Sequence, residues 1–238
     1  MNSFFSMFKR SAESLKDLRT ITTTGILLAM AVAIRSLAIH ITPDLRIIFT
    51  FVPLCVIAML YGPVVSGMSA VALDIIGYII DNRGARGYSP QLAMVVLLTG
   101  VIYGCFLYRD KISFAMIIFA RGIAVLLCNI CLNSYFLYSL YINKDFSVFT
   151  ADKHAWDMFM TWLWTSFRLP KNLAELPLDF IILIVVLPAA WTAYIVLLKV
   201  QKRKLPLIKN RRICYENKSR IYRSGQYGSR YYAWYRRR

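Results

Sequence analysis

The chain is poor in acidic residues and histidines, and it carries no familiar catalytic or nucleotide-binding motif. Of its 238 residues, 12 are Asp or Glu and two are His, against 29 Lys and Arg, which gives a formal net charge of +17. HExxH, GxSxG, the P-loop GxxxxGK[ST] and EF-hand spacing are all missing. We therefore predict no catalytic residues, no metal and no cofactor, and an ATP-driven process would need a separate ATPase subunit.

A disulfide pattern is missing as well. Four of the five cysteines lie in apolar stretches, at Cys55, Cys105, Cys128 and Cys131. The last two form a CxxC, but no second pair accompanies it. This arrangement favours packing in a membrane helix over a metal or redox role.

The chain does contain six long apolar stretches. Its hydrophobic content of 58% is too high for an ordinary soluble domain, and about 20 apolar residues span a bilayer core. The stretches lie at about 20–41, 47–62, 63–80, 90–108, 112–142 and 172–198. We therefore predict an all-α integral membrane protein with six transmembrane helices. Its three parts are an N-terminal segment, the membrane domain and a disordered basic tail, at residues 1–18, 19–200 and 201–238.

Basic residues concentrate in the N-terminal segment, in the turn at 109–111 and in the tail. If the chain crosses six times, these segments share one side, and the positive-inside rule puts both termini in the cytoplasm. The opposite loops also carry cations that could serve a ligand: Arg46, Arg83, Arg86, Lys144, Lys153, Arg168 and Lys171. The tail interleaves Arg with Tyr and Trp, which beside a membrane helix favours anionic lipid over nucleic acid.

Polar side chains inside predicted helices are candidates for a ligand site, because they are costly in lipid. Asp74 lies in mid-helix, with Tyr78 one turn later on the same face. Asn129 and Asn133 are four residues apart, and each offers two N–H donors and a carbonyl acceptor. These groups could read the edge of a heterocycle, or they could bond to neighbouring helices.

A polar group also marks the start of the last helix. Arg168, Lys171 and Asn172 could bind a carboxylate there, helped by the free N–H groups of the first turn. Two alternatives stay open. Glu175 and Asp179 follow on a nearby face and could neutralise the cations, or the cations could simply snorkel to the interface.

Other positions point to helix packing or to a partner. Ala29 and Ala33 are small and four residues apart, so another helix can approach closely, either within this chain or from a partner protein. Gly100 and Gly104 form a GxxxG pair with the same property. Arg121 lies in an apolar run, and we interpret it as structural or partner-facing.

Several short motifs, taken in order, resemble one family. They are LRIIFTFVP at 45–53, MLYGP at 59–63, ALDIIG at 72–77, LTGVIYG at 98–104 and RLPKN at 168–172. They resemble the substrate-binding S components of energy-coupling factor (ECF) vitamin transporters, most closely the folate family (FolT). The resemblance covers about residues 18–200. The segment 82–90 departs from it in being rich in Arg, and the tail is longer than in the family.

This resemblance implies a six-helix S-component fold in the bacterial plasma membrane, with both termini cytoplasmic. It implies capture of folate or a reduced folate outside, and delivery inward with a T component and two ABC ATPases. In the family an AxxxA on the first helix faces the T component, and Ala29 and Ala33 supply it here.

Folate also fits the candidate residues chemically. Its pterin edge suits Asn or Asp, its ring system can stack on Tyr or Trp, and its carboxylates suit Arg46, Arg168 or Lys171. The pantothenate branch is the nearest rival. A lipid-modifying membrane enzyme would need a catalytic constellation that is not visible. A structural scaffold would not explain Asp74, Asn129 and Asn133 inside apolar helices.

Overall fold

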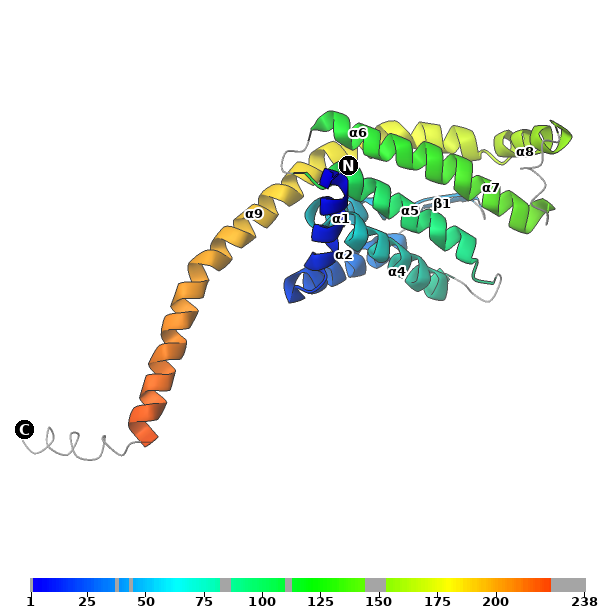
Figure 1. Cartoon of the computed structure of the whole chain (residues 1–238). Helices are drawn as coiled ribbons and strands as arrows, with labels where there is room; N and C mark the ends of the chain where they lie inside the picture. Colours follow the sequence, from blue (N-terminus) through cyan, green and yellow to red (C-terminus); the bar gives the residue numbers. More distant parts are fainter. Residues whose placement is uncertain are drawn as a thin grey trace, which may run out of the picture. The chain divides into compact units, whose positions relative to one another are not determined.

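The computed structural model describes residues 2–36, 39–42, 45–81, 87–109, 113–143 and 153–223. The chain divides into two compact units, Met1–Ala189 and Ala190–Arg238. In chain order the elements are α1 (Asn2–Ser14), α2 (Leu18–Ser36), β1 (Ile39–Thr42), β2 (Leu45–Ile47), α3 (Phe51–Tyr61), α4 (Pro63–Asp81), α5 (Pro90–Leu107), α6 (Phe114–Ile123), the π-helix η1 (Ala124–Asn133), α7 (Ser134–Leu137), the π-helix η2 (Tyr138–Asn143), α8 (Lys153–Thr165) and α9 (Arg168–Arg223) (Figure 1).

Among the described residues, five helical segments are long and apolar enough to cross a membrane. They are Leu18–Ser36, Pro63–Ile80, Pro90–Leu107, Phe114–Ile142 and Arg168–Leu197. Large apolar side chains on them stay exposed, among them Met94 at 72% and Ile79 at 71%, as expected for helices that face lipid. The helix α3 is apolar too, but its 11 residues reach only about half of a ~30 Å hydrocarbon core. The protein is thus an α-helical membrane protein.

A short β-hairpin departs from the predicted all-α fold. In this antiparallel pair Ile39 lies opposite Ile47 and His40 opposite Arg46. The first predicted helix, 20–41, therefore ends at Ser36. Isoleucine is apolar and threonine is uncharged, so both can continue a hydrophobic stretch of sequence. Their β-branched side chains nevertheless favour extended backbone. Hydropathy alone could not separate this hairpin from the helices beside it.

Three helix boundaries also differ from the prediction. The second apolar helix, predicted from residue 47, begins at Phe51. Between the fifth and sixth predicted helices the chain forms a further helix, α8. The last helix begins at Arg168 and continues to Arg223, where the sequence analysis had predicted a disordered tail from residue 201. Lys, Arg and Leu in that tail are good helix formers. The rest of the predicted tail, 224–238, lies outside the described residues.

The helix α5 packs against α3 and α4, and its contact with α4 depends on two glycines (Figure 1). A Cβ atom on Gly104 would overlap the backbone of Pro63, and one on Gly100 would come within 2.6 Å of the carbonyl oxygen of Ser66. The Ser66 hydroxyl donates to the carbonyl of Gly100 at 2.7 Å. The close packing predicted for this GxxxG pair is confirmed.

The N-terminal helix α1 is attached to the turn between α3 and α4. Ser11 is fully buried; its hydroxyl donates to the carbonyl of Tyr61 at 2.7 Å and accepts from the backbone N–H of Val64 at 3.0 Å. Gly62 has a φ of 84°, and a Cβ atom there would press on Ser11 at 3.0 Å. Leu15, after α1, packs against the core cluster that contains Tyr61. The α1 helix therefore lies at the end of the bundle where α3 meets α4.

Candidate ligand-binding site

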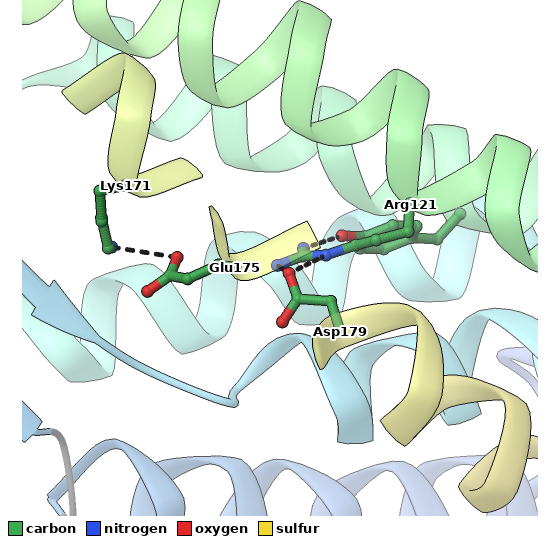
Figure 2. Close-up of polar contacts among 5 residues, drawn as sticks. Arg121, Lys171, Glu175 and Asp179 are labelled. Atoms are coloured by element: carbon green, nitrogen blue, oxygen red, sulfur yellow. Dashed lines mark hydrogen bonds and ion pairs between the residues drawn. The ribbon is translucent and has the colours of Figure 1, made fainter. Parts of the chain in front are cut away.

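A buried ion pair on α6 and α9 joins four helices. Arg121 on α6 is 8% exposed and Asp179 on α9 is 3% exposed. Nε and Nη2 of Arg121 donate to Oδ2 of Asp179 at 3.0 and 2.7 Å, and Nη1 donates to the Tyr103 hydroxyl of α5 at 2.6 Å (Figure 2). The guanidinium carbon also lies 3.8 Å from the ring centroid of Phe51 on α3. Because Arg121 is buried within the chain, its role is structural and not partner-facing.

A row of charges continues along α9 from this pair. Lys171, Glu175 and Asp179 follow one another at intervals of four residues and share a face of the helix (Figure 2). Nζ of Lys171 lies 3.3 Å from Oε2 of Glu175. Glu175 therefore neutralises Lys171, one of the two alternatives to carboxylate binding that the sequence left open. The other oxygen of Glu175, Oε1, is buried without a hydrogen-bond partner in the described structure.

Arg168 and Asn172 lie on the first turn of the same helix. The guanidinium of Arg168 lies 5.5 Å from the ring centroid of Trp162 on α8, a distance at which a cation and an aromatic face attract each other. Nδ2 of Asn172 donates to the backbone carbonyl of Arg168 at 2.7 Å. The structure thus brings Arg168, Lys171 and Asn172 together. Each of the three side chains already makes a contact within the protein: with Trp162, with Glu175 and with the backbone of Arg168, respectively.

An aromatic cluster from α8 and the segment around α7 lies beside this turn. The ring centroid of Tyr138 is 5.4 Å from that of Phe159 and 5.3 Å from that of Trp162. The ring centroids of Tyr135 and Phe159 are 6.4 Å apart. The sequence pattern alone assigns none of these aromatic residues to the site, because scattered aromatic side chains give no periodic signal.

Asn129 and Asn133 lie in η1, and both are half-buried. The backbone carbonyl of Asn129 accepts the Ser134 hydroxyl at 3.1 Å. Short π-helical stretches within α-helices are frequent at functional sites. Val125 and Ile130 of η1 pack with Leu163 of α8, beside Leu169 and Leu176 of α9. This cluster brings the segment that carries the two asparagines to the beginning of α9.

Asp74 belongs to a second polar group, on α4. The Tyr88 hydroxyl lies 3.4 Å from Oδ2 of Asp74, and the Tyr88 ring meets that of Tyr78 edge-on at 5.1 Å. Arg35 of α2 attracts the Asp74 carboxylate and lies against Gly77. Burial and the negative charge of Asp74 raise the pKa of Tyr88, so its hydroxyl stays protonated and can donate. The next residue, Ser89, lies 3.0 Å (Oγ to hydroxyl) from Tyr141 of η2, which links the α4 group to the segment that carries the asparagines.

The remaining predicted residues lie elsewhere. Arg46 is part of β2, and its side chain lies outside the described part of the structure, as do Arg83, Arg86 and Lys144. On α2, Ala29 and Ala33 are exposed while Ala31 between them is buried at 2%. A Cβ atom on Gly25, four residues before Ala29, would meet nothing within 4 Å. This face of α2 is therefore open along its small residues.

Comparison with known proteins identifies the family. Residues 19–187 match the family described as the ECF transporter, substrate-specific component. The chain belongs to this family. The S component identified here is therefore related to transport subunits, and its helices make it a multi-pass membrane protein.

Individual relatives of this S component are named folate transporters. It is 32% identical to the folate transporter FolT of Leuconostoc mesenteroides over 162 residues, which is 66% of this chain and 80% of that one. It is 35% identical over 96 residues to FolT of Clostridium novyi, a match that spans 40% of this chain and 55% of that protein. Among solved structures, the crystal structure of FolT bound with folic acid is similar, with a TM-score of 0.54 and 28% identity over 69% of this chain and 88% of that one.

Proposed function

We propose that this S component captures folate or a reduced folate outside the cell and delivers it inward as part of an ECF-type ABC transporter. The observation that carries this proposal is the similarity to a FolT whose crystal structure contains folic acid, over 88% of that chain. The folate transporters of Leuconostoc mesenteroides and Clostridium novyi support the same substrate.

Both termini are proposed to be cytoplasmic, with α3 completing six crossings. Arg10 of α1 lies 6.0 Å from the ring centroid of Tyr108, just after α5, and Ser11 is bonded to the turn after α3. These segments share one end of the bundle, and the exposed Lys9 and Arg109 belong to it as well. By the positive-inside rule this end faces the cytoplasm, so Tyr88, Tyr141 and the beginning of α9 face outward.

The ligand is proposed to bind at that outer end. The amides of Asn129 and Asn133 and the carboxylate of Asp74 suit the donors and acceptor of a pterin edge, and Tyr78 supplies an aromatic ring. Cations beside them suit the carboxylates of the glutamate. The substrate-binding residues proposed are Arg46, Asp74, Tyr78, Asn129, Asn133, Arg168, Lys171 and Asn172.

Transport requires partners in this proposal. The chain has no nucleotide-binding motif, so ATP hydrolysis is assigned to two separate ABC ATPases, joined to the S component by a T component in the membrane. The open face of α2 at Ala29 and Ala33 is the proposed docking surface, because small exposed residues let a partner helix approach closely.

Calorimetry on the purified protein in detergent tests the substrate. We expect folate to bind without ATP, because the site is contained in this chain, and we expect pantothenate not to bind. The control is a titration with ATP alone, which should give no heat of binding. Tight binding of pantothenate without binding of folate would assign the protein to the rival branch.

A further inference from the structure

We propose that Glu175, through its oxygen Oε1, is a further acceptor for the N–H donors on the ring of the ligand, beside the polar groups already proposed for the pterin edge. The inference rests on the proposed function and names one specificity-determining contact within it. The ligand class it selects is a flat heterocycle with an amino group next to a ring N–H, as in the pterin of folate. From the sequence alone, Glu175 is predicted only to neutralise a cation.

The first argument is the unmet bonding of one oxygen. Oε1 of Glu175 is buried and lacks a hydrogen-bond partner in the described structure, although the side chain as a whole is 17% exposed. A buried polar atom without a partner is costly, and more so when it carries charge. A donor on a bound molecule would remove this cost.

The second argument is the way the carboxylate is held. Nζ of Lys171 lies 3.3 Å from Oε2 of Glu175 (Figure 2). This ion pair holds the carboxylate in one orientation and so sets the direction in which Oε1 points. One turn further along α9, two nitrogens of Arg121 bond Oδ2 of Asp179 at 3.0 and 2.7 Å. Asp179 also differs in its second oxygen, because Oδ1 is not among the buried atoms of the described structure that lack a hydrogen-bond partner. Of the two acidic groups on this face, Glu175 is therefore the one with an acceptor to offer.

The third argument is the charge and shape of the surroundings. The pair of Lys171 and Glu175 is neutral as a unit, so it suits a neutral donor edge. Trp162 of the aromatic cluster lies against Arg168, on the first turn of the helix that carries Glu175. The apolar cluster of η1 and α9 brings the segment with Asn129 and Asn133 to the same helix. Acceptor, amides and aromatic surface together fit a heterocycle.

The test compares wild type with Glu175→Gln, which keeps the size of the side chain but puts an NH₂ group in place of one oxygen. Dissociation constants are measured in detergent for folate, for pteroate (which has the ring but no glutamate) and for p-aminobenzoylglutamate (which has the glutamate but no ring). We expect E175Q to weaken folate and pteroate by about ten- to a hundredfold, as for a lost bond to a charged acceptor, and p-aminobenzoylglutamate by much less. Asp157→Asn, at an exposed position of α8, is the matched control and should bind like wild type.

The outcomes separate the alternatives. Unchanged pteroate affinity in E175Q would overturn the inference, and so would a loss confined to ligands that carry glutamate, because Glu175 would then act only by orienting Lys171. If E175Q does not fold, Glu175→Asp keeps the charge but withdraws the oxygen by one methylene; it should weaken pteroate at least tenfold, and wild-type affinity there would overturn the proposal. If wild type binds neither folate nor pteroate, the proposed function itself fails and the inference falls with it.

Discussion

Replacing Arg121 with methionine is expected to destabilise the protein by about 3–5 kcal/mol, because it leaves Asp179 as a buried charge without its partner. Arg121 contacts α3, α5 and α9 at once, through Phe51, Tyr103 and Asp179. Thermal unfolding in detergent, followed by circular dichroism, should show a large fall in the midpoint.

The double variant R121M/D179L is the matched control. It removes both charges, so no unpaired ion is left in the interior, and apolar replacements of a buried pair are often neutral or stabilising. We expect it to recover most of the lost thermal stability. An R121M variant as stable as wild type would contradict the role of Arg121 as the link between the four helices.

Replacing Ala29 and Ala33 with leucine should strongly reduce vitamin uptake while leaving ligand binding intact. Both residues are exposed on α2, and leucine side chains there would hold a partner helix away from the backbone. We expect uptake in cells that carry the T component and both ATPases to fall by about tenfold or more. Folate affinity in detergent should stay within about twofold of wild type, because both alanines are exposed and neither is among the proposed ligand-binding residues.

Ala115→Leu on α6 serves as control, because Ala115 is also exposed but lies outside the proposed docking surface. It should transport normally. Normal transport by A29L/A33L would show that the partner docks elsewhere. Loss of folate binding in that variant would mean that the two alanines support the fold of the S component itself.

The apolar helices of this fold were predictable, and its irregular elements were not. Runs of apolar residues locate α4, α5 and the long segment from Phe114 to Ile142, and the GxxxG spacing correctly indicates where α4 approaches α5. Hydropathy carries no information on hydrogen-bond pattern, so it could not distinguish η1 from an α-helix. It also could not separate the Ile-rich strand β1 from the end of α2.

The candidate site shows a similar division. The spacing of Asp74 and Tyr78 predicts that the two side chains share a helix face, but the residue that bonds Asp74 is Tyr88, which is 14 positions away and beyond any local rule. The pairing of Lys171 with Glu175 follows the i,i+4 rule and was open to prediction. Arg121 and Asp179 are 58 residues apart. Only their shared property, a charge inside an apolar run, could have suggested that they pair.

The most direct test of the proposed function is mass spectrometry of the small molecules that co-purify with the full chain from cells grown with folate. The site proposed at the outer end of the bundle is complete within this chain, so folate or a reduced folate should be recovered in near-stoichiometric amounts. The N129L/N133L variant should recover much less, because it removes two amides that are proposed to contact the pterin edge. Recovery of pantothenate or another vitamin in place of a folate would contradict the account.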